Sequence, residues 1–411
     1  MPSLSSSHRA ATLALALVAL AAGRAPAAPA APRAPLWVTG YYAGWYWDWY
    51  PPVAVDMTTM THFVFARYGP GGGVAGGSPG QLVEGAGTGH DPSVENALVT
   101  KAHANGIKAL AMLGGAGDGG GWVASTATPA LRATFIGNVL DKCVQKDYDG
   151  VDVDWEDSLD TATQQNQLVA LLTELRTAAA ARSRYQPPHA PFVITFPGYV
   201  LNINIDVVPP WKVTVASLVD QYNLMSYDMR YSCCGWQTWL WSPLKGAAAA
   251  TPTSIESSIQ GYVDAGVPRS KLGLGLGLYG GGYGPPVTGP RQAISGYWGG
   301  DDNVSNYRDL YANGLLDPAA YVFDSAAQAG YYVYSPARTY HGTTVSMLIT
   351  EDLQSIAAKG AWARAGNCAG AIVWTINYGY VPSLAANPPM DAVKQAFLAP
   401  TPVELQSLTV E

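Results

Sequence analysis

Eight short apolar runs rich in β-branched and aromatic residues recur along this chain, and most are separated by amphipathic helical patterns. Strands that alternate with helices belong to a parallel sheet, because a parallel pair needs a long crossover. The runs are Leu36–Tyr42, Thr61–Phe65, Ile107–Leu113, Gly150–Trp155, Phe192–Phe196, Gln221–Met225, Leu272–Leu276 and Gly370–Trp374. Eight such units predict an α/β fold, the (β/α)8 TIM barrel. A doubly wound open sheet is the alternative, but no Gly-x-Gly-x-x-Gly turn follows the first run.

Two stretches fall outside this rhythm. The glycine-rich Gly69–Gly89 is predicted to be a loop. Gly280–Val345, rich in Tyr, Gly and Pro, is too long for an ordinary connection. It predicts a small inserted subdomain between strand seven and helix seven, on the face that carries the C-terminal strand ends. The barrel domain is expected over residues 31–400, with a short tail at 401–411.

The N-terminus is typical of an export signal. His8 and Arg9 precede twelve small or apolar residues, and small-residue cleavage sites follow, such as Ala28-Pro29-Ala30. The apolar run is too short to span a bilayer. We therefore expect residues 1–30 to be a signal peptide and the mature protein to be secreted into the extracellular space.

Composition and charge limit the classes of partner and cofactor that this chain is expected to bind. The net charge is −7 and no basic patch is present, so neither nucleic acid nor a membrane is expected as a partner, and a monomer is expected. Export allows disulfides, so Cys233 and Cys234 could form a vicinal bridge, while Cys143 and Cys368 are expected to be buried or free thiols. No Cys/His cluster suggests a metal, and no cofactor is expected.

The most specific chemistry lies in Asp149–Glu156. Read as a strand, this segment places Asp152, Asp154 and Glu156 on one face, about 7 Å apart per two-residue step. Like charges at that distance resist ionising together, so at least one proton should be retained near neutral pH. A protonated carboxyl backed by a carboxylate is what glycosidic bond cleavage requires. A solvated acidic strand or a cation site is the alternative, although the spacing is not that of a calcium loop.

Aromatic residues gather at the ends of other predicted strands, where the active sites of such barrels lie. Sugar rings have apolar faces that stack on such side chains. Each aromatic taken singly is more often part of a core, but position at a strand end favours binding for Trp374 and Tyr227. Strand ends also carry Tyr41, Phe65 and Asp228.

These residues resemble the chitinases of glycoside hydrolase family eighteen. Asp149–Glu156 matches the family signature D-G-x-D-x-D-x-E at every fixed position. Gln221–Asp228 is similar to the sixth-strand motif, Lys271–Gly280 to the seventh strand, and Gly370–Trp374 to the eighth strand with its floor tryptophan. The resemblance spans about Trp37 to Phe397.

The resemblance implies substrate-assisted hydrolysis of β-1,4 linkages in chitin and chitooligosaccharides, with retention. Glu156 would protonate the leaving oxygen while the acetamide of the substrate attacks C1, giving an oxazolinium ion. Asp154 would orient the acetamide and stabilise that ion, and Asp152 would share its proton. Tyr227 would bind the acetamide oxygen, and Trp374 would form the floor. The same subsite would be lined by Tyr41, Phe65, Met225 and Asp228.

The chain departs from the family pattern at three places. Met112 occupies the position of a serine that supports the inner aspartates, so Asp152 is expected to lean toward its protonated form. Ala116 stands where an aromatic often follows the paired glycines, and Gly281 stands where an arginine is common. These changes bear on affinity and pH optimum more than on the reaction.

Two other functions stay open. An endo-β-N-acetylglucosaminidase acting on N-glycans would use the same chemistry. A non-catalytic chitin-binding lectin would keep the barrel and lose the acid, and the presence of Glu156 argues against it.

Overall fold

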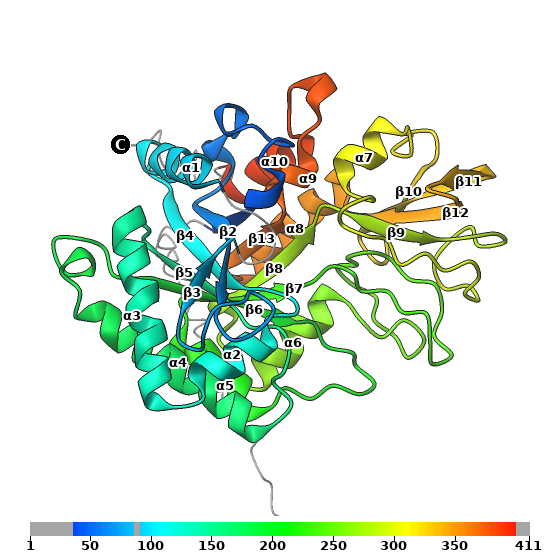
Figure 1. The fold of residues 1–411 in the computed structure, drawn as a ribbon. Coiled ribbons are helices and arrows are strands. Elements are labelled where there is room, and N and C mark those ends of the chain that lie inside the picture. The colour runs from blue at the N-terminus through cyan, green and yellow to red at the C-terminus, as the bar shows by residue number, and fades with distance from the viewer. Residues whose placement is uncertain (1–35, 86–90, 400–411) are drawn as a thin grey trace, which may run out of the picture. The chain divides into compact units, whose positions relative to one another are not determined.

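The computed structural model describes residues 36–85 and 91–399, and its central element is a closed parallel barrel (Figure 1). Closure is complete because β1 pairs in parallel with both β2 and β13. The eight barrel strands are β1 (Trp37–Ala43), β2 (His62–Pro70), β4 (Lys108–Gly114), β5 (Gly150–Asp154), β6 (Val193–Tyr199), β7 (Gln221–Met225), β8 (Leu272–Gly277) and β13 (Gly370–Trp374). The predicted TIM barrel is therefore confirmed, and the open sheet is excluded.

Helices pack around the barrel strands, and several begin at side-chain caps that their sequences supply. Thr161 and Gln164 form a capping box at the start of α4, and the side chain of Thr128 accepts the amide of Leu131 at the start of α3. The helices are α1 (Pro92–Ala104), α2 (Gly119–Thr126), α3 (Pro129–Lys146), α4 (Ala162–Ala180), α5 (Pro210–Leu218), α6 (Ile255–Asp264), α8 (Leu353–Gly366), α9 (Ile376–Gly379) and α10 (Pro388–Val393).

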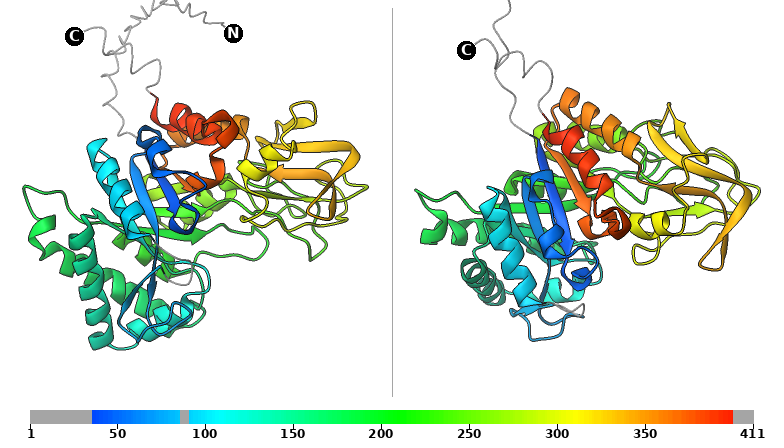
Figure 2. Two further views of the ribbon diagram at one scale, coloured as in Figure 1. Left: turned by 45° about the horizontal axis from the view of Figure 1, so that its top comes forward. Right: turned by 90° about the horizontal axis from the view of Figure 1, so that it is seen from above.

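The segment after β8 forms a second sheet of four antiparallel strands in the order β10-β11-β12-β9. Both views of Figure 2 show these yellow and orange strands gathered to one side of the barrel strands. Its elements are β9 (Gly280–Tyr283), α7 (Tyr307–Ala312), β10 (Tyr321–Asp324), β11 (Ala329–Tyr340) and β12 (Thr343–Thr350). The inserted subdomain thus extends five residues past the predicted end at Val345.

The expectation of a plain loop at Gly69–Gly89 is wrong in part. Strand β2 continues to Pro70, and β3 (Leu82–Glu84) folds back to pair with it in antiparallel register. Glycines at positive φ, such as Gly76 and Gly77, turn the chain between the two strands.

The four cysteines form one disulfide and two free thiols, an arrangement that the sequence allowed. Cys233 and Cys234 form a vicinal disulfide, and Cys143 and Cys368 are free and buried. Within the described ranges, no helix is both long and apolar enough to cross a membrane. The predicted signal peptide at 1–30 and the tail at 401–411 lie outside the described residues.

Candidate active site

Strand β5 presents its carboxyl series to the barrel interior and its apolar series to the surrounding helices. Val151, Val153 and Trp155 belong to the large core between strands and helices. Asp152 and Asp154 face the other way and are only 0% and 4% exposed. The predicted alternation is therefore confirmed. Burying two carboxyls side by side is costly, so their partners and protonation decide how the site works.

Asp152 has a hydroxyl partner on the neighbouring strand. β5 and β6 pair in parallel with Asp152 opposite Thr195, and the Thr195 hydroxyl donates a hydrogen bond to Oδ1 of Asp152. Burial raises the pKa of Asp152 to about 6, while the hydroxyls of Thr195 and Tyr41 lower it. Met112 offers no hydroxyl to the inner aspartates, as the sequence predicted, but Thr195 and Tyr41 each place a hydroxyl against Asp152.

Asp154 lies between two other carboxyls. Burial raises its pKa well above the ordinary value, the charges of Glu156 and Asp152 raise it further, and the Arg67 guanidinium opposes the rise. Arg67 donates to the carbonyl oxygen of Gly114 at 2.9 Å and pairs with Asp118 at 2.6 Å. Burial and the neighbouring carboxyls therefore favour a proton retained within this series, and Asp152 and Asp154 titrate as a coupled pair.

Glu156 comes two residues after Asp154, the last residue of β5, and its side chain stands at the mouth of the barrel. Burial raises the pKa of its carboxyl, a hydrogen bond with Asp154 lowers that pKa, and the neighbouring Asp157 charge adds to the rise. Hydrogen bonds from Tyr199 and from the backbone N–H of Ala116 act in the opposite direction. A carboxyl with a raised pKa keeps its proton to higher pH, which is the property that a general acid requires.

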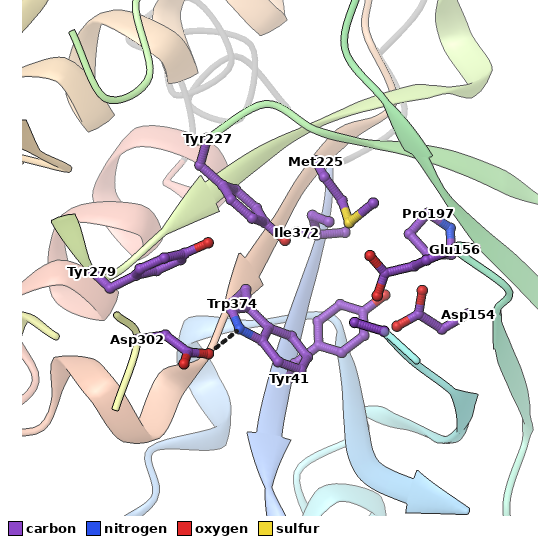
Figure 3. Close-up of a pocket in the computed structure, with 11 residues that line it drawn as sticks. Tyr41, Asp154, Glu156, Pro197, Met225, Tyr227, Tyr279, Asp302, Ile372 and Trp374 are labelled. Carbon is purple, nitrogen blue, oxygen red and sulfur yellow. Dashed lines mark hydrogen bonds between the residues drawn. The ribbon is translucent and has the colours of Figure 1, made fainter. Parts of the chain in front are cut away.

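The carboxyls of Asp154 and Glu156 open into a cavity of about 210 Å³ at the C-terminal ends of the strands (Figure 3). In Figure 3 these two carboxyls approach each other on one side, and Tyr227 and Tyr279 lie across the cavity. The lining residues are Tyr41, Ala116, Asp154, Glu156, Pro197, Met225, Tyr227, Tyr279, Asp302, Ile372 and Trp374. A mixed aromatic and carboxylic lining of this kind suits a sugar ring, which has apolar faces and polar edges.

The structure brings most of the predicted residues together. Tyr41, Met225, Tyr227 and Trp374 line the cavity with Asp154 and Glu156, while Asp152 lies one step deeper. The rings of Tyr41 and Trp374 are tilted against each other with centroids 5.7 Å apart.

Phe65 is not part of this site, contrary to the prediction. It is fully buried in the outer core, where its ring stacks on Tyr42, whereas its strand neighbours Val64 and Ala66 face the barrel interior. Successive side chains of a strand point to opposite faces, so placing Phe65 outward follows directly from placing Val64 inward.

Asp228 also lies outside the cavity lining. Its side chain is 46% exposed at the rim, and its carboxylate pairs with the guanidinium of Arg230. Arg230 is buried, stacks over Trp241 with its guanidinium carbon 4.7 Å from the ring centroid, and its Nε lies 2.9 Å from the position that a Cβ on Gly281 would occupy. Because Gly281 has no side chain, Arg230 has room beside the end of the predicted seventh strand. The family pattern has an arginine at the position of Gly281 itself.

Sequence reasoning missed two polar members of the cavity. Tyr279 comes just after the predicted seventh strand Leu272–Leu276, so its place near a strand end was a usable signal. Asp302 comes from the inserted subdomain, and its Oδ2 accepts a hydrogen bond from Trp374 Nε1 at 3.3 Å (Figure 3). The same atom accepts a hydrogen bond from the Tyr378 hydroxyl at 3.0 Å. No local pattern distinguishes Asp302 from other loop carboxylates.

The residues that the structure describes include no group of three or more His, Cys, Asp or Glu side chains arranged to hold a metal ion.

The family model described as glycosyl hydrolases family 18 matches residues 38–379. Among curated proteins, the chain is similar to Chitinase 1 of Aphanocladium album, with 28% identity over 282 residues, 62% of this chain and 59% of that protein. The chain thus spans little more than half the length of this relative.

Solved structures repeat the fold at lower identity. A class V chitinase from Nicotiana tobaccum in complex with NAG4 is similar with a TM-score of 0.69 at 20% identity, over 89% of this chain and 99% of that one. A chitinase-like agglutinin from Robinia pseudoacacia is similar with a TM-score of 0.67 at 21% identity, over 87% and 99%. These likenesses show the barrel alone, whereas the family model spans every strand of it, and this chain belongs to glycosyl hydrolases family 18.

Proposed function

We propose that the protein is a chitinase that hydrolyses β-1,4 linkages between N-acetylglucosamine units with retention of the anomeric configuration. The observation that carries the proposal is the arrangement of buried Asp154 and partly buried Glu156, two neighbouring carboxyls with raised pKa values that open into one aromatic cavity. A protonated Glu156 supplies the proton that the leaving glycosidic oxygen needs.

The nucleophile in this proposal comes from the substrate. Asp152 and Asp154 project from the same segment as Glu156, and the proposal gives them the roles of proton acceptor and stabilising carboxylate, so neither is the nucleophile. Asp302 lies elsewhere in the lining, but its Oδ2 already accepts two hydrogen bonds, from Trp374 and Tyr378. The acetamide oxygen of the bound sugar therefore attacks C1 and forms an oxazolinium ion.

The other cavity residues act on that intermediate. Asp154 turns toward the acetamide N–H and, once its proton has passed to Asp152, carries the negative charge that stabilises the oxazolinium ion. The Tyr227 hydroxyl donates to the acetamide oxygen, and the Trp374 ring forms the floor under the sugar. Glu156, now a carboxylate, then activates the water that opens the ring from the same face.

The experiment is a product time-course on chitohexaose with the anomers resolved, run beside cellohexaose. Cleavage of chitohexaose with initial β products and no cleavage of cellohexaose supports the proposal, because glucose units lack the acetamide. Comparable rates on both substrates would mean that a protein carboxylate attacks instead. Binding of chitohexaose without any turnover would favour a lectin, and preferential release of N-glycans from a glycoprotein would favour the endo-glycosidase.

We also propose that the protein is exported after removal of residues 1–30, from the basic start and the apolar run described above. N-terminal sequencing of the protein recovered from the culture medium tests this. A mature start near Ala28 to Pro35 supports export, and recovery of the intact N-terminus inside cells contradicts it.

A further inference from the structure

Tyr199, which no motif identifies, reaches the residue proposed as the acid. It is the last residue of β6, the strand next to β5 in the barrel. Its hydroxyl donates a 2.9 Å hydrogen bond to the backbone carbonyl oxygen of Glu156 and lies 3.5 Å from Oε2 of the same residue. Both oxygens lie within reach of the one hydroxyl, so a small reorientation of the Tyr199 O–H aims the same proton at the carboxyl.

The backbone of Tyr199 is held on two sides. In the β6–β7 pairing Tyr199 is opposite Met225, and the Tyr262 hydroxyl of α6 donates to the carbonyl oxygen of Tyr199 at 2.9 Å. The residue is 47% exposed, and its side chain is not among those lining the cavity. Tyr199 therefore contacts Glu156 from outside the cavity, on the solvent side of the mouth.

The groups around Glu156 are mostly acidic or phenolic. Asp154 on its own strand and Asp157 in the turn after it are acidic, so they disfavour a further negative charge. The Arg67 guanidinium acts in the opposite direction, through its charge interaction with Asp154. The titratable or charged groups that face the series from the surrounding elements are Asp152, Asp154 and Asp157 around β5, Tyr41 on β1, Arg67 on β2, Tyr199 on β6, Tyr227 after β7, Tyr279 after β8 and Asp302 in the insert.

We propose that Tyr199 is a positioning residue for the acid, which fixes Glu156 at the mouth and donates to the carboxylate that remains after proton transfer. This rests on the proposed function. Before transfer, the Tyr199 hydroxyl anchors the backbone of Glu156. As the proton leaves Oε for the glycosidic oxygen, negative charge develops on the carboxyl, and the hydroxyl turns to Oε2, where a charge-assisted hydrogen bond is stronger.

The variant Tyr199→Phe keeps the ring and removes the hydroxyl. On chitohexaose, kcat should fall about 10-fold, the low end expected for loss of a hydrogen bond to a charged group. KM should change less than about twofold, because the residue lies outside the cavity lining. The basic limb of the pH profile should move to higher pH, since the hydroxyl favours the ionised form of Glu156 and its loss raises the pKa.

A nitrophenyl chitobioside separates positioning from general damage to the fold. Its leaving group departs with little help from an acid, so Tyr199→Phe should be nearly as fast as wild type on this substrate. Tyr311→Phe, a partly exposed tyrosine on α7, is the matched control and should change neither rate nor pH profile.

Equal loss on both substrates with an unshifted pH profile would overturn the role of Tyr199. Full activity of Tyr199→Phe on chitohexaose would overturn it too. The proposed function is tested separately by Glu156→Gln. An active Glu156→Gln enzyme would show that Glu156 is not the acid and would contradict the proposed function. An inactive Glu156→Gln enzyme beside a fully active Tyr199→Phe enzyme would contradict only the inference about Tyr199.

Discussion

The Thr195 hydroxyl donates its hydrogen bond to Oδ1 of Asp152 across the parallel pairing of β5 and β6. Both side chains are completely buried, so this contact is made without competition from bulk water. It favours the ionised form of Asp152 and so keeps one carboxylate available to take the proton from Asp154 when the oxazolinium ion forms.

Removing that hydroxyl should shift the acidic limb of activity. Thr195→Val keeps the branched shape and deletes the donor, so the pKa of Asp152 should rise above about 6. The carboxyl series must carry one carboxylate to stabilise the intermediate. If the pKa of Asp152 rises, that carboxylate forms only at higher pH, so the acidic limb of the kcat profile should move to higher pH. The profile of kcat against pH measures this.

The matched control is Thr39→Val, since the Thr39 hydroxyl is buried on β1 and has no hydrogen-bond partner among the described residues. It should leave the acidic limb in place. An unshifted limb in Thr195→Val, or equal shifts in both variants, would contradict the role given to Thr195.

Replacing the acid should abolish most turnover while keeping the fold. Glu156→Gln removes the transferable proton, and general acid help is worth about 10²–10⁴-fold. Turnover of chitohexaose should fall by that factor, whereas chitohexaose binding by calorimetry should persist. Glu256→Gln, at an exposed carboxylate that pairs with Lys245, should be fully active. More than about a tenth of wild-type turnover in Glu156→Gln would exclude Glu156 as the acid.

The two aspartates should differ in importance. Asp154→Asn removes the carboxylate that stabilises the oxazolinium ion, whereas Asp152→Asn removes only the group that takes up the proton of Asp154. Asp154→Asn should therefore lower kcat further. In both variants the pH profile should lose the steps of a coupled pair. Stopped-time assays over the pH range compare them, and a more damaging Asp152→Asn would reverse the assigned roles.

The carboxylate of the inserted subdomain should govern affinity. Asp302 holds the indole N–H of Trp374 and the hydroxyl of Tyr378, so Asp302→Ala frees the floor of the cavity to tilt. Each lost hydrogen bond is worth about 1 kcal/mol, which predicts a rise in KM of roughly fivefold or more with a smaller change in kcat.

Asp317→Ala is the control for the insert, because Asp317 pairs with Arg338 away from the cavity lining. It should leave KM unchanged. Equal effects of the two substitutions, or a loss confined to kcat in Asp302→Ala, would mean that Asp302 does not position Trp374.

Local patterns in the sequence were enough to predict the barrel and the carboxyl series. Alternation along Gly150–Trp155 is a property of the strand itself, so the faces of Asp152, Asp154 and Trp155 followed without tertiary information. The strand ends likewise predicted Tyr41, Tyr227 and Trp374 at the mouth, because parallel strands that close a barrel all end on the same side.

The facing of the β2 side chains and the partners of several site residues depend on long-range contacts, so only the tertiary structure decided them. Strand β2 is buried on both faces, so its unbroken apolar run carries no alternation, and only the barrel register placed Val64 inward and Phe65 outward. Thr195, Tyr199 and Asp302 are each more than forty residues away in sequence from their respective partners, Asp152, Glu156 and Trp374. Strand pairing and the packing of the insert bring these partners together, and neither is encoded in the spacing of neighbouring residues.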